Sequence, residues 1–120
     1  MRILIDECLP TRCRTWFPGQ AVETVEFRGW KGVLNGALLA RAVAAGFEVL
    51  LTADRQMVRQ HDFSKLPLAV VVTPGNRLSI LNGLKDTIIA AVEQATPGDY
   101  VEVPGPLAAD ETLDGSETAP

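Results

Sequence analysis

The stretch Ile3-Leu4-Ile5-Asp6-Glu7, close to the start of the chain, decides the fold. A short apolar run that ends in carboxylates is typical of a buried strand with charge at its carboxyl end. The pattern recurs in Val49-Leu50-Leu51-Thr52-Ala53-Asp54. If the two strands are parallel neighbours, Asp6 and Asp54 emerge together at one edge of a sheet. That pair of acids is the main candidate for chemistry.

Strand and helix patterns alternate along the rest of the chain. Apolar and alternating runs predict strands over residues 2–5, 21–27, 47–51, 68–72 and 100–103. Apolar periodicity and helix-breaking residues predict helices over 10–17, from Asn35 to a stop at Gly46, over 54–60 and over 76–95. This alternation predicts an α/β fold, a three-layer sandwich around a central, mostly parallel five-stranded sheet. We expect the strand order 2-1-3-4-5, which places Asp6 and Asp54 at the switch point where such sheets bind ligands.

Composition indicates one folded domain. The chain has 120 residues, of which 47% are apolar, and we expect a folded body over residues 1–104 and an acidic, disordered tail over 105–120. Residues 99–120 carry six acids and no Lys or Arg, so the rest of the chain is slightly basic and gives weak support for a nucleic-acid partner. No apolar stretch approaches the ~20 residues of a membrane span, and no signal peptide is recognised. We therefore expect a cytoplasmic protein with no membrane partner.

The carboxylates Asp6, Glu7 and Asp54 suggest a metal site. Mg²⁺ and Mn²⁺ prefer oxygen ligands and keep several waters, so two or three converging carboxylates are enough to hold one beside a phosphate. The alternative is that Asp6 and Asp54 only cap the helices that follow them. Asn35 has the same two interpretations, because Asn is a good N-cap and its amide oxygen can also bind a metal. The cysteines Cys8 and Cys13 suggest neither a disulfide nor a metal knuckle.

The opening Asp6-Glu7-Cys8-Leu9-Pro10 resembles the Asp-Glu-Asn-Leu-Pro opening of a bacterial family of PIN-like domains. The resemblance continues through residues 22–25, 29–32 and 35–39 to Thr52-Ala53-Asp54, and it covers roughly residues 1–95. It implies a metal-dependent ribonuclease, with Mg²⁺ or Mn²⁺ as cofactor and RNA as substrate. Many PIN domains are toxins of toxin–antitoxin pairs, which implies an antitoxin-like protein partner, and many form homodimers.

The family pattern carries over only in part. Asp6, Glu7 and Asp54 match acids of the family, which makes them the implied catalytic residues, with Asp6, Asp54 and Asn35 as the implied metal ligands. Asn35 stands where the family usually has Asp, and Gln56-Met57 stands where it has Asp-Phe. These losses of charge favour an alternative, a catalytically degenerate domain that binds a protein or RNA. A phosphate-binding domain of the response-regulator kind is a weaker alternative, because no suitable Lys follows a later strand.

Basic side chains near the predicted edge are candidates for substrate binding. Arg55 follows Asp54 and is placed to meet a phosphate, while Arg12 and Lys31, together with Arg14 and Arg28, form a basic approach for an RNA backbone. For each of these residues, a solvated surface charge is the competing interpretation. Trp30 is either a platform for a base or a cover for a hydrophobic edge. The single histidine, His61, falls in a predicted loop and suggests a surface role.

Overall fold

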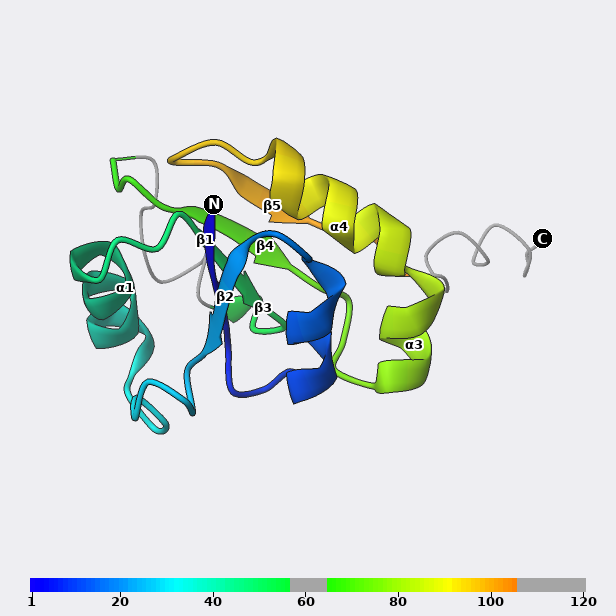
Figure 1. Ribbon diagram of the computed structural model, residues 1–120, viewed down its shortest axis with the longest axis horizontal. Helices are drawn as coiled ribbons and strands as arrows, with labels where there is room; N and C mark the ends of the chain where they lie inside the picture. The colour runs from blue at the N-terminus through cyan, green and yellow to red at the C-terminus, as the bar shows by residue number, and fades with distance from the viewer. Residues whose placement is uncertain (57–64, 106–120) are drawn as a thin grey trace.

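Five parallel strands form the centre of the protein. The computed structural model describes residues 1–56 and 65–105 (Figure 1). The strands are listed here in chain order: β1 (Arg2–Ile5), β2 (Ala21–Thr24), β3 (Val49–Thr52), β4 (Ala69–Val72) and β5 (Tyr100–Glu102). They lie in the order β2-β1-β3-β4-β5, and every neighbouring pair is parallel. The predicted α/β class and strand order are therefore confirmed.

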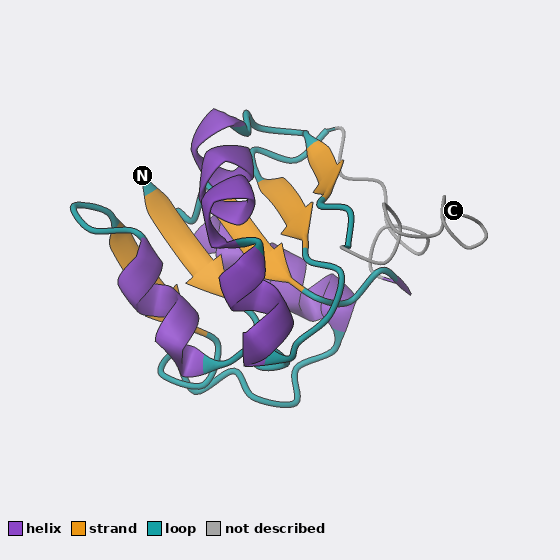
Figure 2. Ribbon diagram, turned by 90° about the vertical axis from the view of Figure 1, so that its right-hand side faces the viewer, coloured by secondary structure: helices purple, strands orange, loops and turns teal. Residues whose placement is uncertain are grey.

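The two sheet faces are covered by different helices. One face packs against the 3-10 helix η1 (Thr11–Trp16) and the helices α3 (Leu78–Gly83) and α4 (Lys85–Gln94). The opposite face packs against α1 (Asn35–Ala44). Figure 2 shows helices in front of and behind the strands. All residues of β3 and β4 are buried, as expected for strands covered on both sides.

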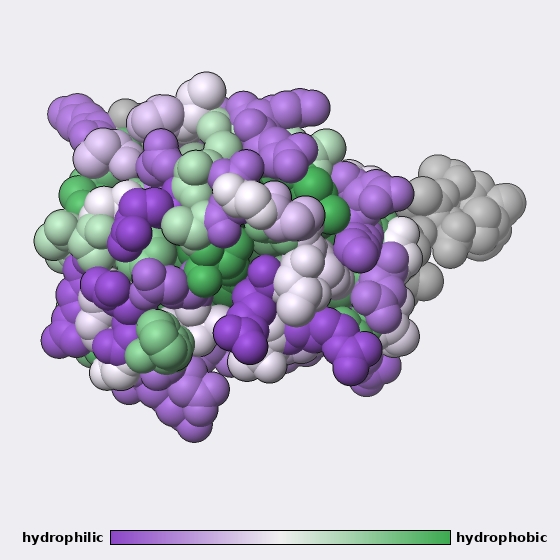
Figure 3. Space-filling view, viewed as in Figure 1, coloured by the Kyte–Doolittle hydropathy of each residue, from purple (hydrophilic) through white to green (hydrophobic). Residues whose placement is uncertain are grey.

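Alternation along the strands divides the core into two clusters. Successive side chains of a strand point to opposite faces. Ile3 and Ile5 therefore pack toward η1, α3 and α4, whereas Leu4 packs toward α1. The edge strands are less buried: β2 and β5 each have a burial pattern dominated by exposed or half-buried residues. On the face in Figure 3, apolar patches near the middle are bordered by hydrophilic residues.

The helix after β1 is shorter and tighter than predicted. The expected helix over residues 10–17 is the 3-10 helix η1, which begins with a bond from the Cys13 N–H to the Pro10 carbonyl. Its two buried residues, Cys13 and Trp16, are three apart. A spacing of three places both side chains on one face of a 3-10 helix, which has three residues per turn.

The long helix predicted over residues 76–95 is two helices. α3 ends at Gly83, and the backbone at Leu84 (φ −112°, ψ 11°) separates it from α4. Gly weakens a helix by about 1 kcal/mol relative to Ala. The break between the two helices therefore comes directly after Gly83. The break leaves Leu81 of α3 and Ile88 of α4 both fully buried against the sheet.

The end of α1 agrees with the predicted stop at Gly46. Gly46 has a positive φ of 84°. Its N–H donates to the Val43 carbonyl at 3.0 Å, and the Phe47 N–H donates to the Ala42 carbonyl at 3.0 Å. This is the Schellman pattern, in which a left-handed residue closes the helix. Because Phe47 belongs to this closure, β3 begins at Val49 and not at Phe47 as predicted.

Several boundaries differ from expectation or lie outside the described residues. The strand predicted over 21–27 ends at Thr24, because the chain turns there and the Arg28 N–H donates to the Thr24 carbonyl at 3.1 Å. Most of the predicted helix over 54–60, His61 and almost all of the predicted tail over 105–120 lie outside the described residues. None of the helices within residues 1–56 and 65–105 is long and apolar enough to cross a membrane.

Candidate functional site at the switch point

The two predicted acids lie on neighbouring strands at the switch point. β1 pairs with β2 on one side and with β3 on the other, so the chain changes direction across the sheet there. The Asp6 N–H donates to the Leu51 carbonyl at 2.9 Å, which extends the pairing of β1 with β3 by one residue. Asp54 follows the end of β3 after the bend at Ala53. Both acids therefore sit at the carboxyl edge, where α/β sheets bind ligands.

The hydroxyl of Thr52 links the two acids. Thr52 is fully buried at the end of β3. Its Oγ1 donates to Oδ2 of Asp6 at 2.6 Å, and it accepts from the backbone N–H of Asp54 at 3.0 Å. The Asp6 side chain is only 8% exposed. One buried hydroxyl thus fixes the Asp6 carboxylate relative to the backbone that carries Asp54.

Asn35, the first residue of α1, also contacts the acid site. Its Nδ2 donates to Oδ2 of Asp54 at 3.0 Å, while Oδ1 of Asp54 accepts from the Gln56 N–H at 2.9 Å. The N-cap of α1 is Leu34, and Asn35 is the first helical residue. The interpretation of Asn35 as an N-cap is therefore wrong, because its side chain makes a long-range contact instead. Its amide orients the Asp54 carboxylate.

Both acids also accept bonds from the chain next to them. Oδ1 of Asp6 accepts from the Glu7 N–H at 2.8 Å, as Oδ1 of Asp54 accepts from the Gln56 N–H. The alternative that Asp6 caps the helix after it is wrong, because the N-cap of η1 is Pro10 and no side chain caps that helix. A carboxylate has about four lone-pair sites, so these bonds leave positions on both acids for a cation.

Cys8 belongs to the site, although the sequence suggested neither a disulfide nor a metal knuckle for it. Its Sγ lies 3.7 Å from Oγ1 of Thr52 and accepts from the Ala53 N–H at 3.4 Å. Burial raises the pKa of the Cys8 thiol, and the nearby Asp6 carboxylate raises it further. The thiol is therefore neutral at pH 7. Cys8 replaces the Asn of the resembling family motif, and this departure was the available signal.

A hollow opens beside these residues. It has a volume of about 410 Å³ and is lined by Cys8, Ala53, Asp54, Gly75 and Asn76. The turn after β4 that supplies its far wall is fixed by Thr73, whose hydroxyl donates to the Gly75 carbonyl at 2.7 Å. The hollow places a half-buried carboxylate, a thiol and a side-chain amide around a space large enough for a phosphate group.

Glu7, the third predicted catalytic acid, is bound to the loop between β2 and α1 and not to Asp6 or Asp54 through Thr52. Its Oε1 accepts from the Gly32 N–H at 2.8 Å. Glu7 therefore ties the loop between β2 and α1 to the start of the chain, and this bond does not direct the carboxylate to Asp54. Arg12, Lys31 and Arg55 are exposed, Arg55 directly after Asp54.

Trp30 packs onto the protein surface. The Arg28 guanidinium lies 4.8 Å from the centre of the Trp30 ring, and the ring meets Phe47 edge-on at 6.3 Å between centroids. Arg28 is also paired with Glu23 at 3.2 Å. Of the two interpretations, Trp30 as a cover for the core edge agrees with its packing against the α1 side of the sheet.

The donor set at the switch point fits a hard cation. Asp6 and Asp54 offer carboxylate oxygens, and Mg²⁺ and Mn²⁺ select oxygen ligands. Two carboxylates match an ion that keeps several of its waters. Within residues 1–56 and 65–105, no group of three or more His, Cys, Asp or Glu side chains is arranged to hold a metal. A cation here would therefore be held by few protein ligands.

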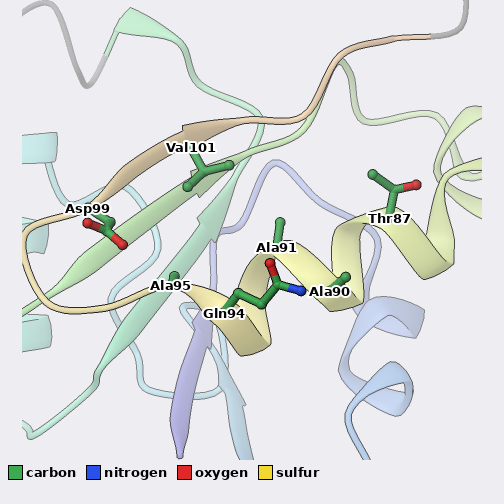
Figure 4. Close-up of a pocket in the computed structure, with 7 residues that line it drawn as sticks. All are labelled: Thr87, Ala90, Ala91, Gln94, Ala95, Asp99 and Val101. Carbon is green, nitrogen blue, oxygen red and sulfur yellow. The ribbon is translucent and has the colours of Figure 1, made fainter.

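A second hollow carries no comparable chemistry. It has a volume of about 400 Å³ and lies between α4 and β5 (Figure 4). Small side chains line one wall, among them Ala90 and Ala91 of α4 and Ala95 directly after it. Asp99 is its one charged lining residue, and its carboxylate accepts from the N–H and hydroxyl of Thr96 at 2.9 Å each.

Comparison of this chain with protein-family models, with curated proteins and with solved structures finds no match. The function is therefore argued from the geometry and from the motifs. Of the predicted residues, hydrogen bonds connect Asp6, Asp54 and Asn35, whereas Glu7 is bound to the loop. Thr52 was part of the strand motif, but nothing local in the sequence marked it as the link.

Proposed function

We propose that this chain is a PIN-like, Mg²⁺- or Mn²⁺-dependent ribonuclease that hydrolyses RNA phosphodiester bonds. The observation that carries the proposal is the Thr52 hydroxyl, which donates to Asp6 at 2.6 Å and accepts from the Asp54 N–H at 3.0 Å at the switch point. The resemblance of the opening motif and of Thr52-Ala53-Asp54 to PIN-like domains supports the same activity.

The side chains have distinct roles in this proposal. A bound Mg²⁺ or Mn²⁺ would activate water and stabilise the charge that develops on the phosphodiester. Asp6 and Asp54 would hold the ion, while Thr52 and Asn35 keep the two carboxylates in fixed orientations. Arg55 supplies an exposed cation next to Asp54 for a substrate phosphate.

Cleavage of a labelled single-stranded RNA with Mn²⁺ tests the proposal. We expect wild type to cleave, Asp6→Asn and Asp54→Asn to lose activity, and all three proteins to keep the same circular dichroism spectrum. Asp86→Asn is the matched control, because it removes an equal charge from an exposed position in the first turn of α4. Cleavage that is undiminished in Asp6→Asn would exclude the proposed site.

A second candidate is a catalytically degenerate PIN-like module that binds RNA or a protein. It is favoured by Asn35, which stands where the family has an acid and donates to Asp54, and by Glu7, whose carboxylate is bound to the Gly32 N–H. RNA binding without cleavage at any Mn²⁺ concentration would support this candidate over the first.

The cellular setting forms part of the proposal. A toxin of a toxin–antitoxin pair would have a small DNA-binding antitoxin encoded in the neighbouring reading frame, and that arrangement can be read from the genome. The thiols of Cys8 and Cys13 are both free. Free thiols fit the reducing cytoplasm, which is the location we propose.

A further inference from the structure

A separate hollow lies between η1 and the carboxyl end of β2. It has a volume of about 290 Å³ and is lined by Thr11 and Arg14 of η1 and by Thr24, Glu26 and Phe27 at the end of β2. It combines a cation, an acid, hydroxyl groups and an aromatic ring. None of these residues belongs to the acid site described above.

Phe27 is the unusual member of this group. Its side chain is 77% exposed, although removal of a benzyl group from water lowers the free energy of the protein. Its backbone is well anchored, because the Phe27 N–H donates to Oγ1 of Thr24 at 3.0 Å and the Arg28 N–H donates to the Thr24 carbonyl at 3.1 Å. The turn thus presents an aromatic ring to solvent on a fixed backbone.

The charges around the ring suit a nucleotide. Arg14 is exposed on the η1 wall, and the ion pairs within the described residues, Arg28–Glu23 and the N-terminal amine with Glu48, do not engage it. Its guanidinium can form paired hydrogen bonds with a phosphate. Glu26 lines the same hollow and can accept from the amino group of a base.

The hollow is next to the acid site. Thr24 pairs with Ile5, which directly precedes Asp6, and neighbouring strands lie about 4.8 Å apart. The bond from the Gly32 N–H to Glu7 at 2.8 Å holds the other end of the same loop against the start of the chain. An RNA strand with one base bound at Phe27 therefore has the phosphates of its neighbouring nucleotides within reach of the switch point.

We propose that this hollow binds a nucleotide of single-stranded RNA, with the base stacked on Phe27 and a phosphate held by Arg14. Stacking on an exposed ring requires an unpaired base, so the site selects single strands over duplexes. This inference rests on the proposed ribonuclease function, because it names the substrate form and the residues that position it.

Binding without metal separates this inference from the cleavage proposal. The probe is a fluorescein-labelled RNA of twelve cytidines, titrated in EDTA and followed by fluorescence anisotropy. We expect Phe27→Ala to weaken binding about tenfold, in line with the loss of one stacked base, and Phe27→Trp to restore it. Arg14→Ala should weaken binding as well. Leu34→Ala is the matched control, since Leu34 is 81% exposed on the same loop but does not line the hollow.

The outcomes distinguish the two proposals. RNA binding that depends on Phe27, without any cleavage when Mn²⁺ is added, would keep the nucleotide site and overturn the nuclease. Cleavage by Phe27→Ala with wild-type KM would overturn the nucleotide site and keep the nuclease. Absence of RNA binding by wild type, or an equal loss in Phe27→Ala and Leu34→Ala, would also overturn the nucleotide site.

Discussion

Replacement of Thr52 by Val removes the hydroxyl that links the two acids and keeps the shape of the side chain. The hydroxyl donates to the Asp6 carboxylate at 2.6 Å, and a hydrogen bond to a charged group is worth about 1.5–3 kcal/mol. The Asp54 N–H also loses its acceptor, which adds about 1 kcal/mol. We therefore expect Thr52→Val to lower the free energy of unfolding by about 2.5–4 kcal/mol.

Urea unfolding at pH 7 in EDTA, followed by circular dichroism, measures this loss. Thr73→Val is the matched control, because Thr73 is equally buried at the end of β4 but donates to a neutral carbonyl, that of Gly75. A neutral bond is worth about 1 kcal/mol, so the control should lose less. If Thr52→Val costs no more than Thr73→Val, the hydroxyl does not organise the acids and the reasoning fails.

Three further variants test other parts of the structure. Asn35→Asp replaces the donor to Asp54 by a second carboxylate, so the free energy of unfolding in EDTA should fall by about 1–2 kcal/mol, and Mn²⁺ should restore it. Equal stability of wild type and variant in EDTA would contradict the contact between Asn35 and Asp54. Gly46→Ala places a side chain at φ +84° and should cost about 1 kcal/mol in thermal unfolding, and a neutral result would refute the helix closure. The backbone N–H and then the hydroxyl of Thr96 lower the pKa of Asp99 below 3.8, so its contribution to stability is present above that pH and is lost as the pH falls through the lower folded value. Asp99→Asn should therefore flatten the acid loss of stability below pH 4, and an unchanged pH profile would exclude this role.

The sheet could be predicted because its determinants are local. Apolar runs of three to five residues, interrupted by Gly, Pro and polar turns, allow little besides buried parallel strands with helical crossovers. The strand order 2-1-3-4-5 is expected because it is a common arrangement of such sheets, and it puts Asp6 and Asp54 at one edge. The parallel pairing and the burial of β1, β3 and β4 agree with this prediction.

The details of the site could not be predicted, because they depend on contacts between distant segments. Asn35 has the local properties of an N-cap, but α1 places its amide against Asp54, nineteen residues along the chain. Glu7 reaches Gly32 across twenty-five residues. Gly83 is a local signal for the division of the last long helix at Leu84. The apolar periodicity continues through Gly83, however, and for that reason the sequence predicts one helix.

Mn²⁺ binding by calorimetry tests the central claim most directly, because it requires no knowledge of the RNA target. The account predicts binding by wild type at millimolar or lower Mn²⁺, loss of binding in both Asp6→Asn and Asp54→Asn, and retained binding in Asp86→Asn. No heat of binding with wild type, or binding that survives in either site variant, would contradict a shared carboxylate site at the switch point.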